Sequence, residues 1–272
     1  MHEPSWSKLR LEHVSKRFEG LDGGTYAALQ DVCLEIHRGD FYCLLGPSGC
    51  GKSTVLSLIA GFERPNEGRI EIDRIEGAGF RTAAIEKPGT DRIVIFQDAS
   101  SALFPWLNVE ENVLFGPSLA GAEEDTLRVQ AYLKMVGLAQ HARKFPFELS
   151  GGMKQRLQIA RSLIMEPEIL LMDEPFAALD AITKRGLQRE LARIWKETRK
   201  TVIYVTHDIF EALLLGTRVA VMTAGPAARI KTEVTIDLPR PRVTSSLAFV
   251  EAAQRLEGLI EEEVHGSRTG GG

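Results

Sequence analysis

Nine consecutive residues have the composition of a loop that holds phosphate groups. They run Gly46-Pro47-Ser48-Gly49-Cys50-Gly51-Lys52-Ser53-Thr54 and match the pattern G-x-x-x-x-G-K-[ST] without a gap. Glycine lets the backbone turn closely enough to aim several N–H groups at phosphate oxygens. Lys52 would then place its ammonium on the β and γ phosphates, and the Ser53 hydroxyl would bind Mg²⁺. The loop predicts a nucleotide-binding protein without fixing its reaction.

A second stretch has the features of an anion site, further along the chain. Residues 149–156 read Leu-Ser-Gly-Gly-Met-Lys-Gln-Arg, so an expected helix opens with a hydroxyl and two glycines. Such a start leaves backbone N–H groups accessible to an anion. Since one nucleotide needs only one phosphate cradle, we expect Ser150, Gly151 and Gly152 to close over the nucleotide held by a second copy.

Four polar residues lie at or just beyond the ends of apolar runs. Asp173 and Glu174 end the run 169–172, Gln97 follows 93–96, and His207 comes shortly after 202–205. In open α/β sheets, ligands bind at the carboxyl ends of the strands, so these side chains are expected to share one crevice.

Each of these residues has a role in nucleotide hydrolysis. Asp173 would hold Mg²⁺, Glu174 would be the general base for the attacking water, and His207 would contact the γ-phosphate. Gln97 would contact both Mg²⁺ and that water. Taken singly, each could be a strand-end polar group satisfied by backbone, and His207 could belong to a cap around Asp208 and Glu211.

The elements that must position these groups can be read from hydrophobic patterning. Alternation over 8–45 predicts half-buried antiparallel strands with a hairpin turn at 37–40, and a helix follows at 53–60. Continuous apolar runs at 169–172 and 202–205 predict parallel strands covered on both faces, and 187–198 predicts the helix of a βαβ unit between them. The run 93–96 predicts a compact buried strand, and 219–222 predicts a further strand. Residues 74–92 predict a surface excursion.

The pattern between 98 and 165 is helical instead. A helix over 123–136 is expected to turn an apolar stripe inward, made of Leu127, Ala131 and Met135 and broadened by Leu133 and Val136. The fold class is therefore α/β, a P-loop NTPase (RecA-like) core with a parallel sheet, an N-terminal antiparallel β subdomain and an inserted α-helical subdomain. We expect one domain over 1–245, with its β and P-loop core at about 8–97 and 166–240, helices at about 98–165, and a frayed tail at 246–272.

Composition excludes several classes of protein. The 272 residues are 44% hydrophobic and 26% charged, with a net charge of −4, which argues against a nucleic-acid partner. No apolar run approaches the ~20 residues of a membrane-spanning helix, and the first residues lack a secretory signal. Cys33, Cys43 and Cys50 follow no disulfide or metal spacing. We expect a cytosolic chain that reaches a membrane only through a partner.

In their order, the motifs resemble the nucleotide-binding subunit of the ATP-binding cassette (ABC) family. Walker A is 46–54, the Q-loop is Gln97, the signature is 149–156, Walker B is 169–174, the D-loop is 178–180 and the switch histidine is His207. The resemblance implies ATP and Mg²⁺ as cofactors and an ATP-dependent dimer. It places Phe18 on the adenine, with Tyr26 close by as an alternative, and it places Asp180 against the opposite subunit.

A narrower resemblance concerns 92–97, 103–109 and 236–242, which are similar to the nitrate/sulfonate/taurine group of importer ATPases. It implies an ATP-hydrolysing subunit at the cytoplasmic face of the inner membrane. Its partners would be an integral permease and, indirectly, an extracytoplasmic solute-binding protein. Leu103, Phe104, Trp106 and Leu107 either receive a permease helix or pack locally.

Two further points stay open in the sequence. A non-transport regulatory or scaffold ATPase is the alternative function, although a second P-loop, a coiled coil and a basic surface are not visible. Cys50 is either a small packing residue or a thiol that can be modified and that ATP protects. The motifs do not identify the solute.

Overall fold

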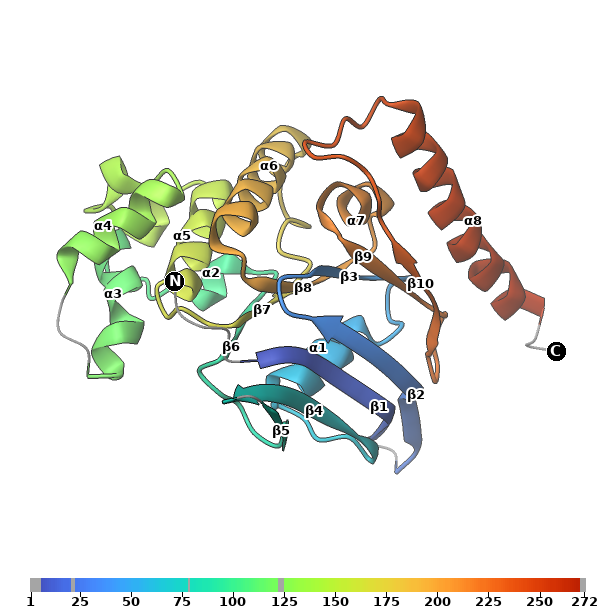
Figure 1. Ribbon diagram of the computed structural model, residues 1–272. Coiled ribbons are helices and arrows are strands. Elements are labelled where there is room, and N and C mark those ends of the chain that lie inside the picture. Colours follow the sequence, from blue (N-terminus) through green and yellow to red (C-terminus); the bar gives the residue numbers. More distant parts are fainter. Residues whose placement is uncertain (1–5, 21–22, 78, 122–124, 270–272) are drawn as a thin grey trace. The chain divides into compact units, whose positions relative to one another are not determined.

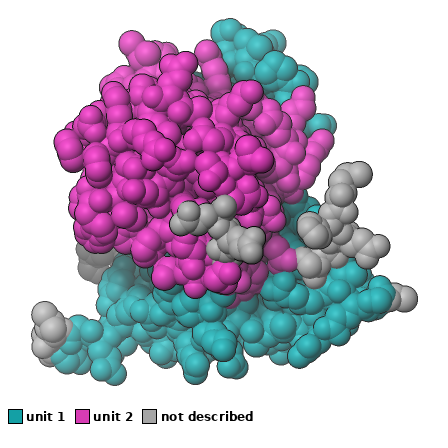
Figure 2. Space-filling model, turned by 90° about the vertical axis from the view of Figure 1, so that its left-hand side faces the viewer, with its two compact units in different colours: residues 1–89, 201–272 teal, residues 90–200 magenta. Residues whose placement is uncertain are grey.

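The computed structural model describes residues 6–20, 23–77, 79–121 and 125–269, with side chains described up to residue 262. The chain divides into two compact units, residues 1–89 with 201–272, and residues 90–200 (Figure 2). The first unit contains the glycine-rich loop and His207. The second contains Gln97, the 149–156 segment, Asp173 and Glu174. Each unit combines strands with helices, as the α/β expectation requires.

One sheet of the first unit is antiparallel. Its strands are β1 (Trp6–Glu19), β2 (Thr25–His37), β4 (Glu67–Glu76) and β5 (Gly79–Ala84), in the order β2-β1-β4-β5. The segment 74–92, predicted as a surface excursion, contains a strand that the prediction lacked, since exposed β5 pairs with β4, and its residue 78 lies outside the described residues. Nearly all of β5 is exposed, so it lacks the apolar alternation by which a strand is recognised in a sequence.

A second set of strands in the first unit carries the glycine-rich loop. In it β3 (Phe41–Leu45) lies between β8 (Thr201–Thr206) and β9 (Arg218–Met222), parallel to both, and β10 (Ile230–Thr235) is antiparallel to β9. Every residue of β3 is buried, as a strand covered on both faces requires.

The hairpin predicted at 37–40 is therefore wrong. The turn itself forms, since Asp40 accepts a 3.0 Å hydrogen bond from the His37 N–H. It leads, however, from β2 in one sheet to β3 in another. The continuous apolar run over 41–45, rather than an alternation, was the signal that β3 belongs to a parallel sheet.

The end of the chain is helical rather than frayed. Helix α8 (Leu247–Thr269), red in Figure 1, buries Phe249 and Leu256. The Phe249 ring lies 5.9 Å from that of Phe210 on α7 (Ile209–Leu215). The predicted frayed tail is thus wrong for 247–269, and 270–272 lie outside the described residues. The charged composition hid a narrow apolar stripe that is sufficient for docking on α7.

Two arginines of the 236–242 segment cap the same α7 helix. Arg240 donates to the carbonyls of Leu214, Leu215 and Gly216. Arg242 donates to those of Leu213 and Gly216 and also to Ile236 and Leu238. Cations at a helix C-terminus satisfy the last carbonyls and oppose the helix dipole, so this segment has a structural role.

The second unit is built on two parallel strands, β6 (Arg92–Ile95) and β7 (Ile169–Asp173). Its helices are α2 (Ala99–Ala102), α3 (Val109–Leu119), α4 (Thr126–Met135), α5 (Gly151–Leu163) and α6 (Ala181–Thr198), with short 3₁₀ turns η1 (Ala139–His141) and η2 (Pro146–Glu148). Helix α5 packs against the other four and against β6. Within the described ranges, no helix is both long enough and apolar enough to cross a bilayer.

Two helix predictions in this unit need correction. The helix expected over 123–136 is α4, and Glu123 lies outside the described residues. Its inward stripe is confirmed at Leu133 and Val136, which are buried, but it is wrong at Leu127, which is 84% exposed, and it missed buried Val129. The helix expected from 187 begins at Ala181 because Asp180 caps it.

Candidate nucleotide-binding and catalytic site

The glycine-rich loop joins β3 to α1 (Lys52–Ala60) and has the shape of a phosphate cradle. Gly49 and Gly51 have φ of 77° and 89°, a left-handed conformation that side chains disfavour. A Cβ at Gly51 would also lie 2.8 Å from the Leu29 side chain. Because the N-cap of α1 is this glycine, its own side chain cannot satisfy the first N–H groups of the helix. Those donors and the helix dipole suit an anion.

Lys52 supplies the cation of this loop. Its side chain is almost fully buried, and Nζ donates to the carbonyls of Gly46 at 2.8 Å and Pro47 at 2.7 Å. These carbonyls hold the ammonium within the loop that it is predicted to serve. An ammonium held beside uncapped N–H groups fits a polyphosphate.

Cys50 lies in the same loop, with Sγ 3.8 Å from Lys52 Nζ. The thiol is buried, and burial raises its pKa against the lowering effect of Lys52. A thiolate is the reactive form of cysteine, so this environment favours the packing interpretation of Cys50 over a readily modified thiol.

The first unit exposes the two aromatic residues that are candidates for the adenine, and one of them, Tyr26, lies near this loop. Phe18 and Tyr26 are directly opposite each other on β1 and β2, and they are 37% and 49% exposed. Lys16 Nζ lies 4.8 Å from the centre of the Phe18 ring. A Cβ at Gly225 would lie 3.6 Å from the Tyr26 hydroxyl and 3.1 Å from the Gly49 carbonyl, so Tyr26 reaches the loop. Both aromatic residues remain candidates for stacking on a base.

His207 follows β8 and is exposed. The next residue, Asp208, is the N-cap of α7 and accepts from the N–H groups of Phe210 and Glu211, so the cap does not require His207. Glu211 is buried and accepts from Thr206 at 2.5 Å and from Tyr204 at 3.1 Å. Sequence reasoning gave Glu211 only a capping role, whereas this buried network fixes the end of β8 next to His207.

In the second unit, the predicted metal and base residues lie at strand ends. Asp173 is the last residue of β7 and is half-buried, and Glu174 comes next with φ of 42°. A left-handed backbone is costly for a residue that has a side chain, and such strain gathers at functional sites. Gln97 is exposed two residues beyond β6. Since β6 and β7 are parallel, these ends point the same way.

Close packing within the second unit requires a glycine at 152 but not at 151. Ser150 is the N-cap of α5 and accepts from the Met153 N–H at 3.3 Å. A Cβ at Gly152 would lie 2.6 Å from Thr183 Cγ2, whereas one at Gly151 would lie 3.3 Å from Leu179 Cδ2. Gly151 is exposed and Gly152 is buried, so the start of α5 presents one open glycine and one packed glycine.

Asp180 has a clear structural role beside these glycines. It is the N-cap of α6, and its Oδ1 accepts from the N–H groups of Ile182 and Thr183 at 3.1 Å each. Hydrogen bonding from Thr183 and Ile182 lowers the pKa of this exposed carboxyl. The structure thus brings the predicted signature and D-loop segments together at one end of α5 and α6.

Side chains of α5 also hold the segment that contains Gln97. With its amide oriented to satisfy both groups, Gln158 accepts from the Phe96 N–H at 3.0 Å and donates to the Phe96 carbonyl at 3.2 Å. Lys154 Nζ lies 3.2 Å from Ser100 Oγ on α2. Sequence reasoning missed Gln158 and Lys154 as supporting residues, and only their place on the helix that follows Ser150 could have indicated them.

The aromatic segment after Gln97 is rigid and partly exposed. Asn112, fully buried, accepts from the Phe104 N–H and donates to the carbonyls of Phe104, Leu107 and Asn108. Phe104 packs on Phe115 at 4.2 Å between ring centres, whereas Trp106 is 69% exposed. Local packing therefore accounts for the apolar side chains of Phe104 and buried Leu103. It does not account for the exposed indole of Trp106.

Comparisons with known proteins agree with this geometry. The family model described as ABC transporter matches residues 29–177. A nitrate import ATP-binding protein of Synechococcus elongatus is 46% identical over 86% of this chain and 83% of its own length. A bicarbonate transport ATP-binding protein of the same organism is 45% identical over 89% and 83%. A taurine import ATP-binding protein of Jannaschia sp. is 41% identical over 95% and 97%.

A solved structure extends the agreement to the fold. It is a dimeric ATP-binding cassette in a post-hydrolysis state, bound to ADP and Pi, with a TM-score of 0.68 and 30% sequence identity. The match covers 85% of this chain and all of that one. The predicted fold class, a P-loop NTPase core with antiparallel and helical parts, is confirmed.

Proposed function

Because the chain belongs to the ABC transporter family, we propose that it is the ATP-hydrolysing subunit of an importer for a small solute. The relatives are named for transport of nitrate, bicarbonate and taurine, so the proposed solute is a small compound of this kind. Other sulfonates are included, because taurine is itself a sulfonate. The observation that supports this most strongly is the loop after β3, where a left-handed Gly51 leaves α1 uncapped beside the Lys52 ammonium.

The loop residues Gly46 to Thr54 would bind the phosphates of ATP through N–H groups and Lys52, and Phe18 would stack on adenine. Ser53, Gln97 and Asp173 are hydroxyl, amide and carboxylate oxygen ligands of the kind Mg²⁺ prefers. Bound Mg²⁺ would neutralise charge on the β and γ phosphates. Glu174 would accept a proton from the attacking water, and His207 would contact the γ-phosphate.

A second copy would complete each site. Ser150, Gly151 and Gly152 of one copy would contact the nucleotide held by the other, since the open end of α5 offers N–H donors and the glycine-rich loop is already a full cradle. Asp180, fixed as a cap two residues before Ile182, would lie at the contact between copies. The dimeric cassette in the comparison structure supports this arrangement.

The membrane partner would be an integral permease, supplied by an extracytoplasmic solute-binding protein, so the chain would lie at the cytoplasmic face of the inner membrane. The rigid loop 103–108 would receive a helix of the permease, with exposed Trp106 as its anchor. Gln97 lies a few residues before that loop and would relay nucleotide binding to the permease.

Purified protein with Mg²⁺ and ATP tests the nucleotide proposal. Replacing Lys52 by Ala removes a charge-assisted contact, so ATP affinity should fall by about 30- to 100-fold. Lys134→Ala, an exposed change on α4, should leave affinity unchanged. Unaltered ATP affinity in Lys52→Ala would contradict the assigned phosphate loop.

Co-purification from detergent-solubilised membranes tests the permease proposal. Trp106→Ala should reduce recovery of the integral partner by at least about tenfold, because truncating an interface tryptophan commonly costs ~2 kcal/mol or more. ATP binding by the variant should be normal. Leu127→Ala is the control, since Leu127 is also a large exposed apolar residue of the second unit. Recovery of a soluble partner alone would favour the regulatory or scaffold alternative.

A further inference from the structure

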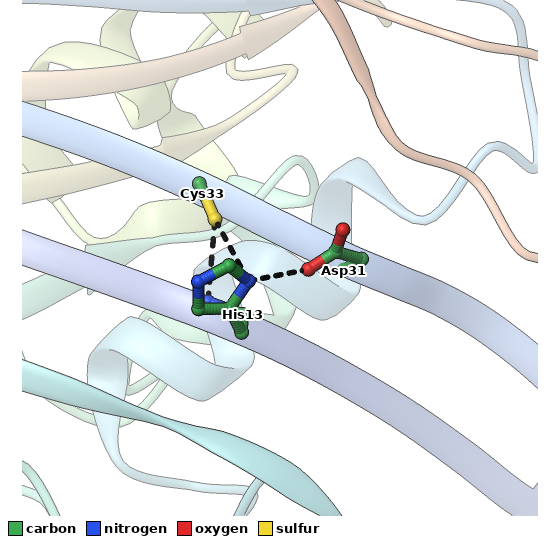
Figure 3. A group of neighbouring side chains, drawn as sticks. All are labelled: His13, Asp31 and Cys33. Atoms are coloured by element: carbon green, nitrogen blue, oxygen red, sulfur yellow. Dashed lines mark hydrogen bonds and ion pairs between the residues drawn. The ribbon is translucent and has the colours of Figure 1, made fainter.

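Three potential metal ligands meet on the exposed face of the antiparallel sheet. They are His13 on β1 and Asp31 and Cys33 on β2, and their ligand atoms all lie within 4.8 Å of one another (Figure 3). His13 Nδ1 lies 2.7 Å from Asp31 Oδ1 and 3.7 Å from Cys33 Sγ. The side chains of His13 and Asp31 are 79% and 56% exposed. The proposed function uses none of the three.

Two bulges of opposite strands create the cluster. Between the pairs Leu11↔Leu34 and Val14↔Val32, β1 has two residues opposite the single Cys33. Beyond Val32 the register shifts again, and there β2 carries the extra residue next to Asp31. His13 and Asp31 both adopt a left-handed backbone, with φ of 51° and 54°.

Because of the bulges, the side chain of His13 lies on the same face as those of Asp31 and Cys33, whereas a regular pairing would put it on the opposite face. Alternation along a strand sends successive side chains to opposite faces, and a bulge redirects them. His13 and Cys33 are twenty positions apart in sequence, which is why no metal-binding spacing was visible there. On β4, Gly68 packs so close to the bulge that a Cβ would lie 2.3 Å from the His13 carbonyl.

One separation in the cluster already has the value of a small tetrahedral site, and all three ligand atoms lie within 4.8 Å of one another. With metal bonds of about 2.0–2.1 Å to nitrogen and about 2.3 Å to sulfur, tetrahedral nitrogen and sulfur ligands lie about 3.6 Å apart. The observed Nδ1–Sγ distance of 3.7 Å already matches this spacing. The Nδ1–Oδ1 pair, now at hydrogen-bond distance, would have to open by about 0.7 Å. An exposed aspartate can do so by rotating its side chain.

We propose that His13, Asp31 and Cys33 bind one divalent cation of the zinc class, with water as the fourth ligand. A thiolate and an imidazole select zinc over Mg²⁺ and Ca²⁺, which prefer oxygen ligands. The backbone N–H of His13 donates to Cys33 Sγ at 3.3 Å and would stabilise the metal-bound thiolate. On binding, the Cys33 thiol proton leaves to solvent, the proton by which Nδ1 contacts Asp31 is displaced from Nδ1, and the imidazole binds as the neutral form with its proton on Nε2. The cation would cross-link β1 to β2.

Metal titration of the full chain without nucleotide tests this site. The protein should bind one equivalent of Zn²⁺ in competition with a chromophoric chelator. Co²⁺ in place of Zn²⁺ should give a thiolate-to-metal charge-transfer band. Zn²⁺ should also raise the melting temperature, because it binds the folded pairing of β1 with β2.

Three variants remove one ligand each and keep the fold. They are Cys33→Ser, Asp31→Asn and His13→Asn, and asparagine tolerates the left-handed backbone at the last two positions. Cys33→Ser should abolish the charge-transfer band, and each variant should weaken Zn²⁺ binding by at least about tenfold.

His37→Gln is the matched control and should bind Zn²⁺ normally. His37 is exposed on β2, the strand of Asp31 and Cys33, but it pairs with Glu35 rather than with the proposed ligands. Stoichiometric binding that survives all three ligand changes, or a charge-transfer band retained in Cys33→Ser, would overturn the proposal. Failure of the wild-type protein to bind Zn²⁺ at micromolar concentration would overturn it as well.

Discussion

Replacing Glu174 by glutamine is expected to slow ATP hydrolysis by about 10²- to 10⁴-fold while ATP binding and ATP-dependent dimerisation persist. Glutamine has the shape of glutamate but cannot accept a proton from water. The substitution also keeps the left-handed backbone, φ 42°, because both residues meet the same steric cost there. The loss should therefore appear in kcat rather than in nucleotide affinity.

Glu166→Gln provides a matched control for this experiment. Glu166 lies in the same unit and also has a positive φ, of 50°, but its carboxylate pairs with Arg128 at 3.0 Å. Its replacement should leave turnover within a factor of about two. Steady-state phosphate release and size-exclusion chromatography with ATP measure the two properties. Normal turnover in Glu174→Gln would exclude Glu174 as the general base.

Replacing Gly151 by aspartate is the second change with a large expected effect. The new carboxylate would occupy the N-terminal end of α5, where the partner's phosphate is proposed to bind, and would repel it. We expect hydrolysis to fall by about 100-fold or more, which corresponds to ~2.7 kcal/mol of lost stabilisation. ATP affinity of the isolated copy, set by the loop after β3, should be unchanged.

We do not expect Gly151→Asp to destabilise the fold, so misfolding should not cause its loss of ATP hydrolysis. An acidic side chain in the first turn of a helix is favourable by about 0.3–1 kcal/mol. The new Cβ would meet only the flexible end of Leu179, at 3.3 Å. Gly186→Asp is the control, since Gly186 lies on α6 and a Cβ there meets nothing within 4 Å. An equal loss of activity in both variants would show that a new charge, rather than its place, is responsible.

Much of the fold followed from local pattern. The apolar runs of β7 and β8 predicted strands covered on both faces, which have no polar face to preserve, and the run of β9 predicted a further strand. The full burial of β3 was missed because its residues were read as part of a half-buried alternation, and the buried strand predicted for β6 is wrong in that only Ile95 of β6 is buried. Strand β5 was missed because it is exposed, and α8 was missed because few of its side chains up to residue 262, Phe249 among them, are buried. The inward face of α4 depends on which neighbours it meets, and one sequence does not contain that information.

The candidate site divides in the same way. The sequence predicted Asp173, His207 and Ser150 at the boundaries of elements. The structure has them there, at the ends of β7 and β8 and at the start of α5. The close approach of Gly152 to Thr183 and the support of Phe96 by Gln158 are contacts between distant segments. The sequence could give the chemistry of each residue but not the side chains that hold it in position.

The central claim is that the α5 end of one copy acts on the nucleotide bound to the other. It is tested most directly by mixing two inactive variants, Lys52→Ala and Gly151→Asp, and measuring ATP hydrolysis. In a mixed dimer, the loop of the Gly151→Asp copy and the α5 end of the Lys52→Ala copy form one intact site. At equal concentrations half of the dimers are mixed, and each mixed dimer has one intact site out of two. About a quarter of wild-type activity should therefore return. If mixed dimers form and activity stays at the level of the separate variants, the 149–156 segment does not serve a second copy.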